Sequence, residues 1–482
     1  MELSTKILAV CLAAFGVSGA TVNFPFPQNV DYGNGIEVSD KATAATQLKS
    51  AFNYYLTDKY KESGNYAAIE KDHGSNTFVS EGIGYGMLMM VYFSDNTTSY
   101  QDQFDKLWAF YKAGSNDHGL MNWSFGGLNP YNNNANAATD AEMDVAAALI
   151  MAAYQFGDDK YLDEAKTLLG NVKKYEFEEN GLHKPGDAWN DKKNPSYIAP
   201  AYYRLFAAVD TDNATFWNTT AMDANYALLE ANSAEYSTGL FDNWSNASGK
   251  GLDSYYGYDA ARTPWRLAQD FYWFGETQAQ TMLSKLGTWV SGYAASDMKG
   301  TIERSGSPMW NDHNSTFVAT LMTSLVTDAS RQTKLDEYWS EVASLGDEAY
   351  FEQSMKILCG LLVTGNMPNL TAGTPSGGNG GGENGGGENG GNENGGGNNP
   401  PEALPRTVAN HTGFSFTNNT VNLDLQDVSN VELLNLQGQK LQTLWNGRGT
   451  GSISLKVSAK KGIYLVRIQG QGIAETHKIA VR

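Results

Sequence analysis

The chain is 482 residues long, with 41% hydrophobic and 12% aromatic residues. It is too long for one average domain and apolar enough to bury a large core. The formal net charge of −19 argues against a polyanionic partner such as nucleic acid or an acidic lipid surface, because either would require clustered Lys and Arg. A neutral polymer is compatible with this charge.

The first 20 residues have the pattern of a secretory signal peptide. Lys6 is their only cation, the run from Ile7 to Val17 is apolar, and small residues precede position 21. This pattern predicts cleavage and an exported chain that starts at Thr21. A lipid anchor on Cys11 is the alternative, ranked second because a bulky valine precedes the cysteine. No other stretch is apolar enough to span a membrane, so we expect a soluble product.

The spacing of apolar residues predicts about twelve helices between residues 43 and 364. They cover residues 43–61, 80–94, 98–114, 138–157, 159–174, 196–209, 213–233, 260–274, 275–294, 314–326, 331–344 and 347–364. Long connections precede every second helix, and short ones follow it. Six helical hairpins with all their long loops at one end predict an (α/α)6 barrel within residues 21–370. Long loops in a compact domain are usually functional, so the site is expected at that end.

Every second helix of this series begins with polar or acidic residues. These are Ser80-Glu81, Thr139-Asp140, Ser196-Tyr197, Asp259 and Asn314. Helix capping explains any one of them taken alone, because such side chains accept hydrogen bonds from free amides. Around Glu81, however, Gly82, Gly84 and Gly86 weaken the helix, which indicates that something approaches the backbone closely.

A second acidic segment lies at the predicted start of the 138–157 helix. Asp140, Glu142 and Asp144 place three acids within five residues, directly before an apolar run. Mutual repulsion makes this pattern costly unless the acids have a role.

The third segment joins an acid to aromatic residues. Asp259 lies one helical turn before Arg262, where an ordinary ion pair is the simplest explanation. Tyr258 and the preceding tyrosines favour a sugar site, because aromatic faces stack on pyranose rings while acids bind hydroxyls. Four tryptophans fall in the long loops, either as stacking platforms or packed onto the barrel rim: Trp123, Trp189, Trp244 and Trp310. Glycoside hydrolysis needs two carboxyl groups, and these segments supply at least three.

Other chemistries find little support in the sequence. The six histidines are scattered, and the mature chain has one cysteine, Cys359, whose apolar neighbours predict a buried structural thiol. No catalytic metal and no cofactor are therefore expected. Neither a G-x-S-x-G elbow nor a phosphate-binding loop occurs.

Residues 371–405 are the predicted linker, since their Gly, Asn and Glu cannot bury apolar area. Residues 406–482 alternate apolar and polar positions in short runs, such as Val431–Leu436 and Ile463–Ile468, which predicts a small β-sandwich. Its turns are expected at Gly438, Gly447–Gly451 and Gly470–Gly472.

The three acidic segments together resemble glycoside hydrolase family 8, over residues 42–363. The run Ser-Glu-Gly-Ile-Gly-Tyr-Gly-Met at Ser80–Met87 resembles the family's general-acid segment, and Ala138–Ala146 resembles its signature helix. The resemblance implies an (α/α)6 barrel that hydrolyses with inversion. It makes Glu81 the proton donor, and Asp140 the residue that holds the sugar where its ring distorts.

The same resemblance assigns the remaining site residues. Asp259, in Tyr-Asp-Ala-Ala-Arg-Thr-Pro-Trp-Arg, matches the catalytic base, Arg262 would orient it, and Tyr197 would lie near the attacking water. The expected substrate-binding set is Tyr197, Arg262, Trp123, Tyr258 and Trp189. Glu142 departs from the family pattern, which usually has Asp there, and Ala141 stands where Gly is frequent. Either change could alter a subsite contact.

The C-terminal part resembles the sorting domain of type IX secretion substrates. The resemblance rests on Val431–Gln439, Gly462–Val466 and His477–Val481. It implies export or surface attachment, with the secretion machinery as a partner. A polysaccharide-binding module is the alternative, for which Trp445 and Tyr464 offer stacking faces.

We therefore expect a secreted or cell-surface monomer that hydrolyses internal β-1,4 bonds of cellulose or mixed-linkage β-glucan. The runs Ser-Glu-Gly-Ile-Gly-Tyr-Gly and Ala-Thr-Asp resemble the cellulase and lichenase branch of the family more than its xylanase branch, so xylan ranks second and chitosan third. Two explanations from other classes remain: a noncatalytic polysaccharide-binding protein, and an (α/α) barrel lyase or epimerase.

Overall fold

The computed structural model describes residues 22–134, 136–346, 349–372, 415–417, 419–434, 440–470 and 473–481. The signal peptide predicted for residues 1–20 lies outside this part of the chain, as does all but the first two residues of the predicted linker. The chain divides into two compact units, one up to Asn379 and the other from Gly380.

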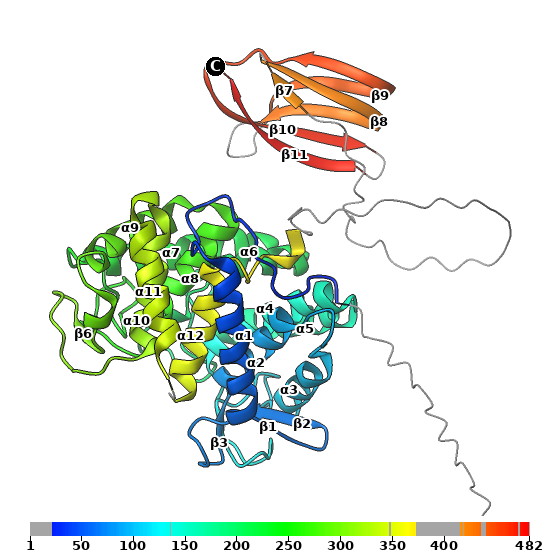
Figure 1. Ribbon diagram of the computed structural model, residues 1–482. Coiled ribbons are helices and arrows are strands. Elements are labelled where there is room, and N and C mark those ends of the chain that lie inside the picture. Colours follow the sequence, from blue (N-terminus) through cyan, green and yellow to red (C-terminus); the bar gives the residue numbers. More distant parts are fainter. Residues whose placement is uncertain are drawn as a thin grey trace, which may run out of the picture. The chain divides into compact units, whose positions relative to one another are not determined.

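The first unit is an (α/α)6 barrel, as predicted (Figure 1). The described part of the chain has twelve α-helices: α1 (Lys41–Asp58), α2 (Ser80–Phe93), α3 (Gln101–Ala113), α4 (Thr139–Phe156), α5 (Lys160–Glu176), α6 (Pro200–Val209), α7 (Met222–Ala234), α8 (Arg262–Phe274), α9 (Thr277–Val290), α10 (Ser315–Met322), α11 (Gln332–Ser344) and α12 (Tyr350–Val363). The even-numbered helices are buried almost all round, whereas the odd-numbered ones bury one face. A helix buried on all sides lies inside a larger core, so the even helices form the inner ring.

Short strands and helical turns occupy the connections. The strands are β1 (Tyr60–Ser63), β2 (Tyr66–Ile69), β3 (Thr77–Val79), β4 (Ser124–Gly126), β5 (Tyr255–Tyr256) and β6 (Ile302–Glu303), paired antiparallel as β1–β2, β3–β4 and β5–β6. The short helical segments are η1 (Pro195–Tyr197), η2 (Thr211–Asn213), η3 (Phe216–Ala221), η4 (Ala295–Asp297), η5 (Thr323–Thr327), η6 (Ala329–Arg331) and η7 (Leu370–Ala372). The first helix ends at Asp58 and not at 61, because the following residues enter the β1–β2 hairpin.

The three glycines of α2 allow close packing within the barrel. A Cβ on Gly84 would lie 2.7 Å from the Cβ of Asp144 on α4. A Cβ on Gly82 or Gly86 would meet Ile69 of β2 at 3.0–3.1 Å. The predicted close approach to this backbone is confirmed, and the approaching groups are α4 and β2.

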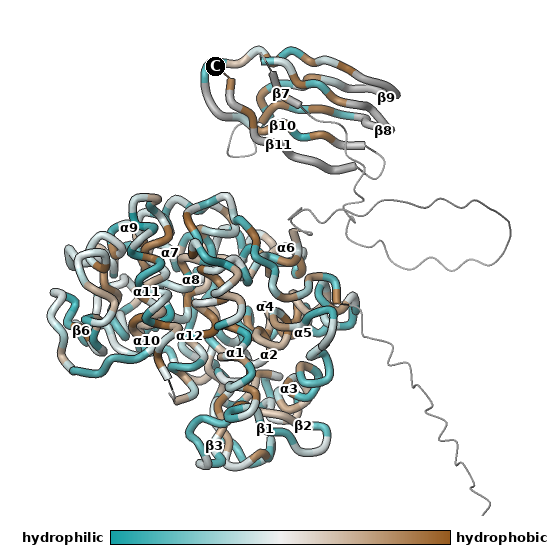
Figure 2. The backbone as a smooth tube through the Cα atoms, in the orientation of Figure 1, coloured by the Kyte–Doolittle hydropathy of each residue, from teal (hydrophilic) through white to brown (hydrophobic). Residues whose placement is uncertain are grey.

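The core of the first unit is continuous and apolar. Cys359 is buried within it, as predicted, and burial raises the pKa of its thiol. Hydrophilic residues colour the loops around β1, β2 and β6 in Figure 2. Among the described residues, no helix is long and apolar enough to cross a membrane.

The second unit is all-β, as predicted. Its strands are β7 (Ser415–Thr417), β8 (Thr420–Leu434), β9 (Lys440–Lys456), β10 (Gly462–Gly470) and β11 (Ile473–Val481). Strand β8 pairs with β9 along its length, and with β7 and β10 at opposite halves of its other edge. Alternating residues such as Val421, Leu423, Val431 and Leu433 form its core.

The turn expected at Gly447–Gly451 is wrong, because β9 runs through it. The β8–β9 register shifts near Val428, which pairs with Gly449. Glycines tolerate the irregular backbone of such bulges, so they mark a bend in a strand here and not its end. The turn predicted at Gly438 lies outside the described residues. Near the turn predicted at 470–472, Gly470 pairs with Ile473 at the end of the β10–β11 hairpin.

The close packing of α2 on α4 predicts opposite effects for two Gly→Ala substitutions. Gly84→Ala should destabilise the protein by about 1–3 kcal/mol, because the added methyl collides with Asp144. Gly170→Ala, on the exposed side of α5 with open space around the site, should stabilise it by about 0.5–1 kcal/mol. Denaturant midpoints of the helical circular dichroism signal would check both. A Gly84→Ala midpoint at or above wild type would contradict the packing argument.

Candidate active site

The predicted acidic segments meet at one buried arginine. Arg262 is the first residue of α8, and its side chain is 3% exposed. Its Nη1 donates to both Glu81 Oε2 and Asp140 Oδ2, and its Nε donates to Ser196 Oγ at 3.1 Å. The starts of α2, α4, η1 and α8 therefore converge on a single guanidinium group.

Helix capping accounts for only some of the polar residues at the starts of the inner helices. Asn314 caps α10, where its side chain accepts from the Thr316 N–H at 3.1 Å. Within the described residues, α2, α4 and α8 begin without a side-chain capping bond. Glu81 and Asp140 form ion pairs with Arg262 instead, and the positive ends of their helices favour their negative charge.

Glu81 has a second partner that the sequence analysis missed. The hydroxyl of Tyr350, the first residue of α12, donates to Glu81 Oε1. The predicted helix 347–364 is the sixth even helix and must begin at the same end of the barrel as the other five. This regular position in the helix series was the sequence feature from which Tyr350 could have been predicted as a site residue.

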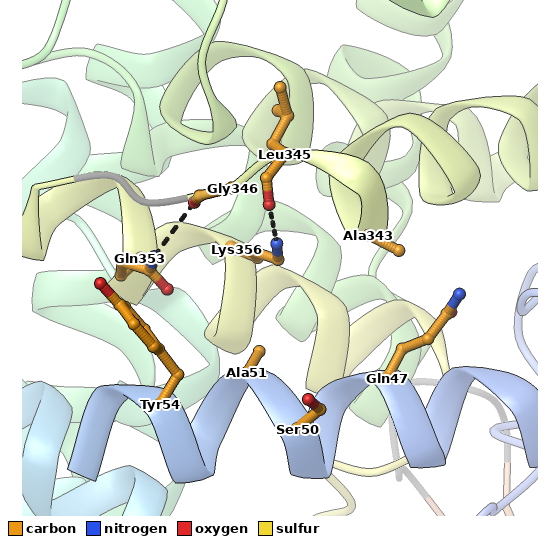
Figure 3. Close-up of a pocket in the computed structure, with 9 residues that line it drawn as sticks. All are labelled: Gln47, Ser50, Ala51, Tyr54, Ala343, Leu345, Gly346, Gln353 and Lys356. Carbon is orange, nitrogen blue, oxygen red and sulfur yellow. Dashed lines mark hydrogen bonds between the residues drawn. The ribbon is translucent and has the colours of Figure 1, made fainter. Parts of the chain in front are cut away.

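Two side chains of α12 bind the backbone just after α11. Gln353 Nε2 donates to the Gly346 carbonyl at 3.3 Å, and Lys356 Nζ donates to the Leu345 carbonyl at 2.5 Å. Both side chains line a cavity of about 320 Å³ between α1 and α12 (Figure 3). None of the predicted site residues lines this cavity. Two of its lining side chains thus tie α12 to the chain at Leu345 and Gly346.

Asp140 is a buried carboxyl with an altered proton affinity. Burial raises its pKa to about 7, although the Arg262 guanidinium opposes the rise, and the neighbouring Glu81 charge adds to it. Near neutral pH, Asp140 is therefore present in both its protonated and its ionised form.

Glu142 points away from this cluster. Its Oε1 accepts from the Tyr111 hydroxyl and the Met121 N–H, both at 3.1 Å. Beside it lies Glu176, the last residue of α5, and both are fully buried. Burial raises the pKa of each well above its usual value, the Asp140 charge adds to the shift of Glu142, and the Glu142 charge adds to the shift of Glu176. Both are therefore neutral acids inside the barrel, and Glu142 makes its contacts with α3 and the 115–137 loop.

Asp259 lies apart from the arginine. It is exposed, in the turn before α8, and its Oδ2 accepts from the indole N–H of Trp244 at 2.9 Å. The Asp259–Arg262 ion pair suggested by their spacing is wrong: the ion pairs of Arg262 within the described residues go to Glu81 and Asp140. The reason is local, since α8 begins only at Arg262 and Asp259 is not on its surface.

Aromatic side chains link the two carboxyl regions. The Tyr197 ring lies 5.0 Å from the Arg262 guanidinium and meets Trp244 edge-on, with centroids 6.4 Å apart. Trp189 lies 6.2 Å from Trp244. This wall of Tyr197, Trp244 and Trp189 joins Arg262 to Asp259.

The other predicted aromatic residues differ in exposure. Trp123 is 42% exposed, and its carbonyl accepts the Ser80 N–H at 2.9 Å, so it is tied to the start of α2. Trp310 is 55% exposed. Tyr258 is only half-buried: its hydroxyl donates to Glu352 at 3.2 Å and its ring packs on Phe317.

Comparison with known proteins identifies the family. Residues 23–366 match the model for glycosyl hydrolases family 8, so the chain belongs to this family. Endoglucanase 2 of Ruminiclostridium josui is 34% identical over 377 residues, covering 73% of this chain and 79% of the relative. Endoglucanase A of Acetivibrio thermocellus is 31% identical, covering 75% and 78%. The apo structure of a β-1,3-1,4-glucanase from Paenibacillus sp. X4 has the same fold, with a TM-score of 0.67 at 24% identity over 72% of this chain and 99% of that one.

The C-terminal unit matches a second model. Residues 417–482 fit the secretion system C-terminal sorting domain. The two matches confirm both resemblances drawn from the sequence. The chain is therefore an exported glycoside hydrolase.

The buried acid pair predicts a pH-dependent stability. The pKa of Glu176 is raised in the folded state, so at any pH above the ordinary pKa of a glutamic acid the chain takes up a proton when it folds. The stability of the folded protein therefore falls as the pH rises through the neutral range. Glu176→Gln removes this titration. Its melting temperature should exceed that of wild type at pH 8, and the difference should shrink towards pH 4.

Glu179→Gln is the matched control, because Glu179 is exposed three residues further on. It should show no comparable gain that grows with pH. A Glu176→Gln variant that is no more stable than wild type at pH 8 would show that the buried carboxyl is not held neutral.

Proposed function

We propose that the protein is an endo-acting enzyme that hydrolyses internal β-1,4-glucosidic bonds of cellulose or mixed-linkage β-glucan with inversion. The proposal rests on one observation: the aromatic wall of Tyr197, Trp244 and Trp189 lies between two carboxyl groups that have different environments. Glu81 lies in the Arg262 cluster, and Asp259 lies at the solvent-exposed side, held by Trp244. Inversion needs this division into a protonated acid and an ionised base with room for water.

Glu81 is the proposed general acid. It is partly exposed, so a leaving glycosidic oxygen can reach it, and it shares the Arg262 guanidinium with Asp140. Tyr350 and Arg262 fix its two oxygens in place. Asp140 would bind the hydroxyls of the sugar at the cleavage point.

Asp259 is the proposed general base. Its exposed carboxylate can take a proton from a water molecule, and Tyr197 lies on the same aromatic wall. Trp189, Trp123 and Tyr258 are the proposed sugar-binding aromatics around these carboxyls.

The glucan preference has support from the relatives. Those named endoglucanase in Ruminiclostridium josui and Acetivibrio thermocellus are 34% and 31% identical, whereas a reducing end xylose-releasing exo-oligoxylanase of Halalkalibacterium halodurans is 25% identical. Xylan therefore ranks second and chitosan third.

We further propose the division into a signal peptide (1–20), a catalytic domain (21–370), a linker (371–405) and a sorting domain (406–482), with the mature protein acting as a monomer without a nucleic acid partner.

The proposed activity is tested by reducing-end release from four polymers in one buffer: mixed-linkage β-glucan, carboxymethyl cellulose, xylan and chitosan. We expect rapid release from the two glucans. Release from xylan or chitosan alone would overturn the substrate assignment. No release from any polymer would favour a noncatalytic binding protein or a lyase, and an ultraviolet-absorbing unsaturated product would identify the lyase.

Two conservative substitutions test the roles of the carboxyls. Glu81→Gln and Asp259→Asn should each lower kcat on β-glucan by roughly 10²–10⁴-fold, because each loses proton transfer in the transition state. Glu81→Gln should still bind cellohexaose, measured by calorimetry, since the acid acts mainly in the transition state. Glu179→Gln changes an exposed charge that has no part in the Arg262 cluster or the Asp259 turn, and it should keep the wild-type rate. Unchanged turnover in either active-site variant would remove that residue from its role.

A further inference from the structure

Three consecutive residues in the loop between α7 and α8 bind different parts of the turn that carries Asp259. The first, Asp242, is fully buried. Its Oδ2 accepts from the Ser254 N–H at 2.8 Å, and its Oδ1 accepts from the Asp253 N–H at 3.1 Å. Asp242 thereby fixes the chain five to six residues before Asp259.

The second residue, Asn243, holds the turn on both sides of Asp259. Its Oδ1 accepts from the Gly257 N–H at 2.8 Å and from the Ala260 N–H at 3.1 Å. One side-chain oxygen therefore ties together the backbone before and after Asp259, which limits how far the turn can move.

The third residue, Trp244, reaches the carboxylate itself. Its indole N–H donates to Asp259 Oδ2 at 2.9 Å. The Lys192 ammonium lies 3.7 Å from the centroid of the same indole. A cation on the face of a ring draws electron density from it, which makes the N–H a stronger donor.

The loop that carries these residues is locked to the barrel by Arg304. This guanidinium is buried, and its Nη1 contacts Asp242 Oδ2 at 3.3 Å and Glu235 Oε2 at 2.6 Å. Its Nε donates to the Leu240 carbonyl at 2.8 Å. The support of Asp259 is therefore connected to Glu235, the residue that follows α7.

We propose that Trp244 is a positioning residue for the general base, with Asp242 and Asn243 as its support. This inference rests on the proposed function, in which Asp259 activates water. An exposed aspartate on a turn rotates freely unless something holds it. A donor on Oδ2 stops this rotation and leaves Oδ1 to take the proton from the attacking water.

The test is a double-mutant cycle on β-glucan hydrolysis. Trp244→Phe keeps an aromatic face but removes the N–H, so one charge-assisted hydrogen bond to Asp259 is lost. We expect kcat to fall about tenfold while KM changes little. In the Asp259→Asn background, the same substitution should leave the residual rate unchanged, because Trp244 acts through Asp259. Trp289→Phe, which removes a half-buried indole from α9, is the control and should keep the wild-type kcat.

A second measurement does not depend on activity. Asp259→Asn should change the tryptophan emission of the full chain, and this change should disappear when Trp244 is replaced by Phe. An emission change that persists in the Trp244→Phe background would overturn the contact. An equal kcat loss with and without Asp259 would overturn the positioning role and assign Trp244 to sugar binding. A wild-type rate for Asp259→Asn alone would instead reject the proposed base.

Discussion

The buried guanidinium group of Arg262 is the interaction on which the site depends. It lies at the centre of the inner helix starts, between Glu81 of α2 and Asp140 of α4, with almost no access to water. A charge in such a place is tolerated only when it is paired, and removing one partner of a buried pair typically costs about 3–5 kcal/mol. The same contact therefore joins three inner helices and brings two carboxyls to the place where a substrate can meet them.

A second ion pair repeats this arrangement one helical turn deeper. Arg266 of α8 donates from Nη1 and Nη2 to the two carboxylate oxygens of Asp144, both at 2.6 Å, and the pair is fully buried. Asp140 and Asp144 are four residues apart on α4, and Arg262 and Arg266 are four residues apart on α8. Because the spacing is equal on the two helices, Asp140 pairs with Arg262 and Asp144 pairs with Arg266. Gly84 allows α2 to pack closely against Asp144.

The three acids of the signature helix thus have different environments and different states. Asp140 and Asp144 face cations, while Glu142 faces Tyr111 and the loop backbone as a neutral acid beside Glu176. Protonation removes the repulsion that made this segment look costly. The three acids can therefore lie within five residues, because two of them pair with arginines and the third is held protonated by burial.

The sequence by itself determined the local features: twelve amphipathic or buried helices, the alternation of long and short loops, and the acids placed at the starts of the inner helices. These follow from the helical period and from helix start signals, which act over a few residues. The tertiary structure alone decided which groups meet. Arg262 pairs with residues 181 and 122 positions away and not with nearby Asp259, Tyr350 reaches Glu81 across 269 positions, and Trp244 holds Asp259. Such contacts depend on how the closed ring brings helix ends together and on where each helix begins, and no local pattern carries that information.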